Sequence, residues 1–249
     1  MKNITVKDKA LLNVSKGAKT ETELLSVSNA SANFNDTVTI GKGLKAENGA
    51  RIMVRNGGEI GGTVTVKGEK TLASLSAMTI KKGSAIEALN KGQIDINGGK
   101  TEKNRVKADG GTVKLRQGSY RLGDIEAKKE GRIYLNSGNK TEIEGNITVD
   151  KPSTVVLQMK GSRSVLRGNI TGEGTARLEL GTNGTWEGTM KTGSSKVKLG
   201  ERSVWTPTEN TDIGFLNGNK AYINMGKANK SWMKISNYSG NAPFYMAHS

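Results

Sequence analysis

Residues 93–115, QIDINGGKTEKNRVKADGGTVKL, open and close with the same motif, two apolar residues separated by one polar residue. Ile94/Ile96 and Val113/Leu115 form these two pairs, which lie 19 residues apart. Strict alternation of apolar and polar side chains predicts β-strands with one buried face. The motif returns at further intervals of 20, 24, 21 and 19 residues, as Ile133/Leu135, Leu157/Met159, Leu178/Leu180 and Val197/Leu199.

A repeat of roughly 20 residues is typical of a solenoid, in which each coil buries its apolar side by stacking on its neighbours. Similar pairs continue towards both ends of the chain, so about a dozen coils fit within the 249 residues. Since the core of a solenoid grows along its axis, this length does not require two domains. The pattern therefore predicts an all-β parallel β-helix that occupies residues 1–249 as a single domain.

The composition favours short strands joined by tight turns. The chain contains 33 Gly and 3 Pro, and no stretch combines a helical apolar period with helix caps. Asparagine followed by glycine suits the positive φ angles of tight turns. The sequence predicts such corners at Asn48-Gly49, Asn56-Gly57, Asn97-Gly98, Asn183-Gly184 and Asn217-Gly218.

No part of the chain predicts export or membrane insertion by itself. The first residues lack the apolar region of a signal peptide, and no window of 18 apolar residues occurs. The absence of cysteine excludes disulfides and thiol chemistry. Because strands are predicted from the first residues to the last, we expect the sequence to be an excerpt from a longer protein.

Eight of the eleven aromatic residues follow residue 185, in a segment with an ordered series of motifs. These are the Trp-bearing segment 203–208, Leu216-Asn217-Gly218-Asn219, Ile223-Asn224-Met225, Asn237-Tyr238-Ser239-Gly240 and Phe244-Tyr245-Met246. The series resembles the end of a pertactin-like autotransporter passenger domain. Upstream, Trp186-Glu187-Gly188 and the repeated Gly-Asn-Ile at 145–147 and 168–170 are similar to earlier coils of that family.

The resemblance implies a right-handed parallel β-helix that crosses the outer membrane of a diderm bacterium by type V secretion, through a barrel that this chain does not contain. It implies a stalk or adhesin at the cell surface, with a role in virulence and no membrane insertion by this segment. Its partner would be a host or bacterial receptor, a glycan or a polyanion, and copies would associate lengthwise. Three features depart from the family: the ending Ala247-His248-Ser249, Asn237-Tyr238-Ser239 in place of a commoner Leu-centred turn, and a net charge of +15 where passengers are often neutral or acidic.

The resemblance further implies that residues 186–249 act as an autochaperone, which folds first outside the cell and templates the following coils. Large rings bury the most area per residue, so we expect these coils to be the most stable. A simpler and compatible interpretation is that each ring is a core or capping residue. We assign this folding and capping core to Trp186, Trp205, Phe215, Tyr222, Trp232 and Phe244.

Basic residues recur at fixed offsets from the apolar pairs. Odd offsets along a strand point away from the core, so stacking would align these residues into a basic stripe that binds polyanions in a salt-dependent way. The alternative is a solvated face that keeps the strands soluble. Glu179 interrupts the stripe, and without interleaved aromatic residues no specific nucleic acid is expected. The stripe comprises Lys114, Arg132, Arg177, Lys196 and Lys198.

Catalytic signals are weak, and we expect no enzyme activity, cofactor or metal site. The chain has one histidine, His248, and no nucleophile motif. A carbohydrate-active β-helix would need carboxylates that converge from adjacent coils. Asp124/Glu126 and Glu142/Glu144 are the candidates, although neighbouring basic residues favour a solvated face instead. The main prediction is a surface stalk or adhesin, with a carbohydrate-active enzyme and a basic polyanion-binding module as alternatives.

Overall fold

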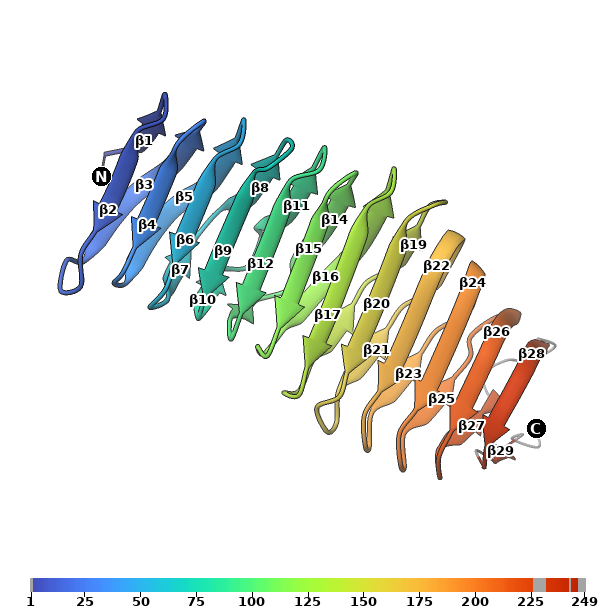
Figure 1. Ribbon diagram of the computed structural model, residues 1–249. Coiled ribbons are helices and arrows are strands. Elements are labelled where there is room, and N and C mark those ends of the chain that lie inside the picture. The colour runs from blue at the N-terminus through green and yellow to red at the C-terminus, as the bar shows by residue number, and fades with distance from the viewer. Residues whose placement is uncertain (1, 226–231, 242, 246–249) are drawn as a thin grey trace.

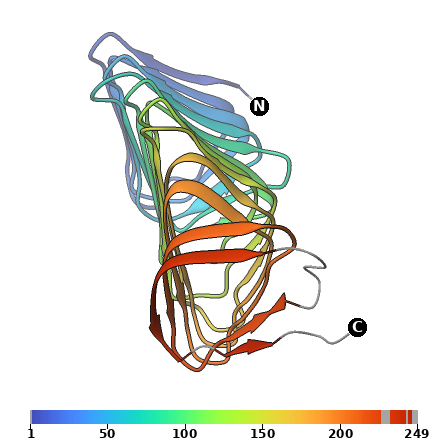
Figure 2. The same ribbon diagram turned by 90° about the vertical axis from the view of Figure 1, so that its right-hand side faces the viewer.

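The computed structural model describes residues 2–225, 232–241 and 243–245. It is an all-β parallel β-solenoid of about 12 turns, with coils of about 20 residues. In Figure 1 the coils follow one another in chain order from the N-terminal to the C-terminal end, and Figure 2 shows them superposed around one elongated cross-section. The predicted fold class is confirmed, whereas the right-handed sense stays a prediction.

Three faces run along the solenoid, and on each face a strand pairs in parallel with its counterparts in the neighbouring coils. Face 1 consists of β1 (Ile4–Lys7), β3 (Thr20–Ser28), β5 (Val38–Glu47), β8 (Thr63–Lys67), β11 (Ala85–Leu89), β14 (Asn104–Asp109), β16 (Arg121–Lys128), β19 (Ile147–Val149) and the first parts of β22 (Ile170–Leu180), β24 (Met190–Leu199), β26 (Thr211–Gly218) and β28 (Met233–Gly240).

Face 2 consists of β2 (Leu11–Val14), β4 (Ser31–Phe34), β6 (Arg51–Val54), β9 (Leu72–Ser76), β12 (Gln93–Asn97), β15 (Thr112–Arg116), β17 (Arg132–Ser137), β20 (Thr154–Met159) and the second parts of β22, β24, β26 and β28. Face 3 consists of β7 (Gly58–Ile60), β10 (Met78–Ile80), β13 (Lys100–Thr101), β18 (Glu142–Glu144), β21 (Val165–Arg167), β23 (Thr185–Glu187), β25 (Val204–Thr206), β27 (Tyr222–Asn224), β29 (Phe244–Tyr245) and the first residues of β3, β5 and β16.

The interior is filled by the inward residues of all three faces. On face 2, Ile94, Val113, Ile133 and Val155 occupy successive positions of one ladder, and all four are buried. An apolar side chain of this size stabilises the fold by about 1.5–3 kcal/mol when it is buried. Because this core is continuous along the axis, the side chains that can meet a partner are the outward ones.

The alignment between coils differs from the predicted one at β20. The sequence matched Leu157/Met159 with Ile133/Leu135, but Ile133 pairs with Val155 and Leu135 pairs with Leu157. The reason is that β20 has three inward apolar residues at alternate positions, Val155, Leu157 and Met159. Either the first two or the last two can be matched with the apolar pair of the preceding strand. Every outward residue after β20 is therefore displaced by two residues, or one outward row, relative to the predicted stripe.

Four of the five predicted Asn-Gly corners lie at turns between strands. At Asn48-Gly49 both residues have positive φ angles, 56° and 77°, which favour asparagine and glycine. The fifth, Asn217-Gly218, instead lies inside β26, where both residues pair with β28. Parallel pairing on face 2 continues through this position, so no corner forms there.

Candidate binding surface

The predicted basic stripe lies on face 2, but its members occupy three parallel rows. Lys114, Arg177 and Lys196 share one register position, which defines the central row. Arg132 lies two residues earlier, in the row of Thr112 and Thr154. The structure therefore brings Arg177 and Lys196 directly together on neighbouring strands and separates the other members.

Lys198 belongs to the third row, beside Glu179. Its Nζ lies 2.8 Å from Glu179 Oε1, and Gln158 Nε2 donates a hydrogen bond of 3.1 Å to Glu179 Oε2. Burial acts to raise the pKa of Glu179, but the hydrogen bond and charge of Lys198 outweigh it and hold the pKa below its ordinary value. Glu179 therefore neutralises Lys198 rather than Arg177.

Aromatic side chains do interleave with the central row, contrary to the expectation from sequence. In register order the row contains Lys114, Tyr134, Val156, Arg177, Lys196 and Phe215. The Lys196 ammonium lies 4.8 Å from the centre of the Phe215 ring, within the range of a cation–π contact. The sequence did not reveal Tyr134 as part of this row, because it lies between two core residues of the apolar motif. It did not reveal Phe215, because the register between β24 and β26 is irregular.

A depression of about 240 Å³ opens in this row over Val156. Val156 is short, whereas the neighbouring positions hold the long side chains of Tyr134 and Arg177. The cations of Arg177, Lys196 and Lys198 border the depression together with Gln158 and Glu179. The arrangement is a small basic recess in a flat surface, rather than an enclosed pocket.

Basic residues outnumber acidic ones on face 2 between β12 and β26. This part of the face holds six Lys and Arg and two acidic residues, Asp95 and Glu179, which leaves an excess of four positive charges. Asp95 is engaged by Arg116, with 3.0 Å between Nε and Oδ1. Within the part of the chain that the structure describes, no carboxylate forms an ion pair with Lys114, Arg132, Arg177 or Lys196.

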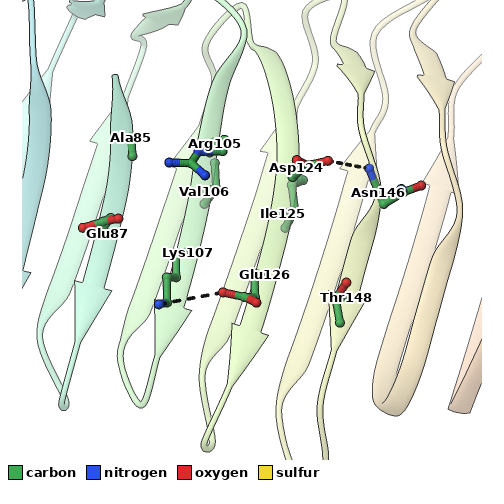
Figure 3. Close-up of a pocket in the computed structure, with 10 residues that line it drawn as sticks. All are labelled: Ala85, Glu87, Arg105, Val106, Lys107, Asp124, Ile125, Glu126, Asn146 and Thr148. Atoms are coloured by element: carbon green, nitrogen blue, oxygen red, sulfur yellow. Dashed lines mark hydrogen bonds and ion pairs between the residues drawn. The ribbon is translucent and has the colours of Figure 1, made fainter. Parts of the chain in front are cut away.

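A second depression, of about 530 Å³, lies on face 1 and contains the carboxylate candidates Asp124 and Glu126. Figure 3 shows them on β16, with Glu87 on β11 and Lys107 on β14 nearby. Asp124 Oδ1 accepts a hydrogen bond of 2.9 Å from the backbone N–H of Asn146. Glu126 has ion pairs of 2.6 Å with Lys128 and 3.8 Å with Lys107. Both carboxylates therefore have structural partners.

Glu142 and Glu144 lie on β18 of face 3 and also contact cations. Lys140 donates to Glu142 and Lys103 donates to Glu144, and these hydrogen bonds lower the pKa of each carboxyl. A general acid working near neutral pH needs a raised pKa instead. Glu126 lies on the face 1 part of β16 and Glu142 lies on face 3, so the structure does not gather all four predicted carboxylates on one face.

The predicted C-terminal core is divided between buried and exposed positions. Trp186 and Trp205 are fully buried and stacked, with 4.3 Å between ring centres and 3° between ring planes. Their Nε1 atoms donate to Gly168 O at 3.2 Å and Gly188 O at 2.9 Å. This coil-to-coil stack satisfies both indole N–H groups inside the core.

The other aromatic residues do not join that stack. Phe215 and Tyr222 occupy outward register positions, opposite Lys196 and Val204, so the core assignment is corrected for both. Trp232, immediately before β28, is 52% exposed and is likewise outside the core. Phe244 pairs with Ile223 through its backbone, while its side chain and the whole of His248 lie outside the described residues.

No protein-family model, curated protein or solved structure matches this chain. Among the residues that the structure describes, no group of three or more His, Cys, Asp or Glu side chains is arranged to hold a metal ion. Within the same ranges, no helix is long and apolar enough to cross a membrane.

Proposed function

We propose that this chain is a stalk segment of an autotransporter passenger, exposed at the surface of a diderm bacterium and anchored through a barrel outside this sequence. The observation that carries the proposal is the unbroken parallel pairing of coils from β1 to β29 around a filled core. Such a rod holds material away from a surface, and its outward rows carry the contacts. The ordered C-terminal motifs support the autotransporter assignment.

The C-terminal coils have a second role in this proposal, as the part that folds first and templates the rest. In a solenoid each coil is stabilised by its neighbours, so a strong coil-to-coil contact favours nucleation at its own position. The Trp186–Trp205 stack supplies such a contact with two satisfied indole N–H groups. The outward positions of Phe215 and Tyr222 concentrate this role in the two tryptophans.

The test is to join the chain to an autotransporter barrel and measure protease-resistant protein on the surface of intact cells. We expect the wild-type chain to be displayed and Trp205→Ala to reduce display several-fold, because it removes a large buried ring at the end that emerges first. Phe34→Ala is the matched control, since Phe34 is a fully buried aromatic residue near the other end. Equal losses in both variants would reduce the role of Trp205 to general stability. Failure of the wild-type chain to reach the surface would contradict the assignment itself.

A further inference from the structure

We propose that face 2 between β15 and β26 binds an extended acidic polysaccharide that lies along the solenoid axis, with an anionic group seated in the recess over Val156, beside Arg177 and on the side where Lys196 follows. The inference concerns the isolated chain and does not depend on the route by which it is secreted. It rests on the central row, the recess within it, and the unpaired charges around that recess.

The central row has the geometry of a linear binding track. Neighbouring parallel strands lie about 4.8 Å apart, so the side chains of Arg177 and Lys196 leave the backbone at points about 5 Å from each other. Lys114 lies three strands from Arg177, which places it about 14 Å further along the same line. A flexible chain with charges at intervals can contact all three side chains in one direction.

The cations of this surface differ from many of those on the other faces. On face 1 Lys107 contacts Glu126, and on face 3 Arg121 and Arg167 contact glutamates of adjacent coils at 3.2 and 3.0 Å. If face 2 served only to keep the protein soluble, ion pairs between its own Lys or Arg and acidic residues would stabilise it in the same way. Arg177 and Lys196 instead border an open recess and retain their charge for an external anion.

Neutral polar side chains beside the central row favour a carbohydrate. Hydroxyl and amide groups both donate and accept hydrogen bonds, as sugar hydroxyls require. Such groups share one flanking row with Arg132 and the other with Arg116, Glu179 and Lys198. The neutral positions are Thr112, Thr154 and Thr175 on one side and Asn136, Gln158 and Asn217 on the other.

The rings of the row argue against a single-stranded nucleic acid. Such ligands stack successive bases on a series of aromatic platforms. Lys196 already covers one face of Phe215, and Tyr134 lies four strands away from it. A single accessible ring fits one sugar or one base, but it does not form a stacking series.

The test measures binding of the purified 249-residue chain by titration calorimetry at low and physiological salt. The probes are a sulfated glucosaminoglycan oligosaccharide, an oligogalacturonate, neutral dextran and oligodeoxythymidylate. We expect one or both acidic oligosaccharides to bind more tightly than the oligonucleotide, and dextran not to bind. The two acidic probes distinguish sulfate from carboxylate as the anchoring group. Equal or tighter binding of the oligonucleotide, or no binding of either acidic oligosaccharide, would overturn the proposal.

Three variants locate the site. Arg177→Glu/Lys196→Glu should weaken binding about tenfold or more, because it places repulsive charges at the recess. Lys7→Glu/Lys67→Glu makes the same change in net charge at exposed positions of face 1 and should leave the affinity within about twofold. Val156→Trp fills the recess without changing any charge and should also weaken binding. Equal losses in the two charge-reversal variants, or full affinity in Val156→Trp, would show a diffuse basic surface and contradict the proposed site.

Discussion

Gly188 shows how a single residue permits the coils to stack. It has a φ of +152°, and its carbonyl accepts the hydrogen bond from Trp205. A Cβ at this position would lie 2.0 Å from the carbonyl oxygen of Gly168, and a Cβ at Gly168 would lie 2.0 Å from that of Gly145. These glycines form a column in which backbone passes against backbone, so any larger side chain must displace a neighbouring coil.

Gly188→Ala should therefore lower the free energy of unfolding by about 2 kcal/mol or more, through strained φ and a backbone clash. Gly138→Ala is the control, because a Cβ there meets no atom within 4 Å and the residue has no left-handed φ. Urea unfolding followed by circular dichroism measures both. A Gly188→Ala protein as stable as Gly138→Ala would refute the account of the glycine column.

At the scale of elements, Asn104 adds a side-chain connection between coils that the backbone ladders already join. It is fully buried at the start of β14. Its Nδ2 donates to Lys81 O at 2.7 Å and to Ser84 O at 3.0 Å, and its Oδ1 accepts from the N–H of Glu102 at 2.7 Å. One amide therefore satisfies three backbone groups at a corner between faces.

Asn104→Leu keeps the volume but removes the donor to the carbonyls of Lys81 and Ser84, while the Glu102 N–H retains the carbonyl of Ile80 at 3.2 Å. We expect the free energy of unfolding to fall by about 2 kcal/mol or more. Asn33→Ala removes a comparable amide whose contact, 2.9 Å to Asn13 Oδ1, is exposed, and should change stability by less than about 0.5 kcal/mol. The comparison is made by urea unfolding under identical conditions. Similar effects of both substitutions would mean that the buried network at β14 is dispensable.

Sequence patterns predicted the elements unevenly, for reasons that these residues make clear. Alternation over Gln93–Asn97 or Thr112–Arg116 is long enough to identify a strand and its inward side. Face 3 strands such as Gly58–Ile60 are too short for alternation to distinguish them from a turn. At β20 three inward residues allowed two alignments, and that ambiguity concealed the place of Tyr134 in the central row, whereas the irregular register between β24 and β26 concealed Phe215. The pairing of Arg177 with Lys196 was predictable, because the interval of 19 residues between the apolar pairs of their two strands also separates these two residues.

At the scale of the whole molecule, ion pairs within and between coils connect stability to pH. Hydrogen bonds from Lys140 and Lys103 lower the pKa of Glu142 and of Glu144 below the ordinary value of 4.5. A carboxyl with a lowered pKa in the folded state adds stability above its unfolded pKa and loses it as the pH falls through the folded value. The positive charge of the chain, +15 at pH 7, also rises as carboxylates are protonated.

The urea midpoint should therefore stay nearly constant between about pH 6 and 8 and decrease as the pH falls below about 4.5. Glu142→Gln/Glu144→Gln should make that acid decrease shallower, because two of the carboxylates that titrate would be absent. Glu173→Gln, at an exposed residue of β22, is the control and should leave the pH profile unchanged. A wild-type midpoint that does not fall in acid would contradict the role of these pairs.

The parallel pairing of the faces also determines how the rod responds to mechanical tension. Its backbone hydrogen bonds run between coils, along the axis, so a pull on the two ends strains one coil boundary at a time. Each coil that peels away would release roughly 65 Å of extended chain. A rod built in this way would lengthen in steps and dissipate mechanical energy during each step, so that the load on its two ends rises more slowly than it would in a rigid body.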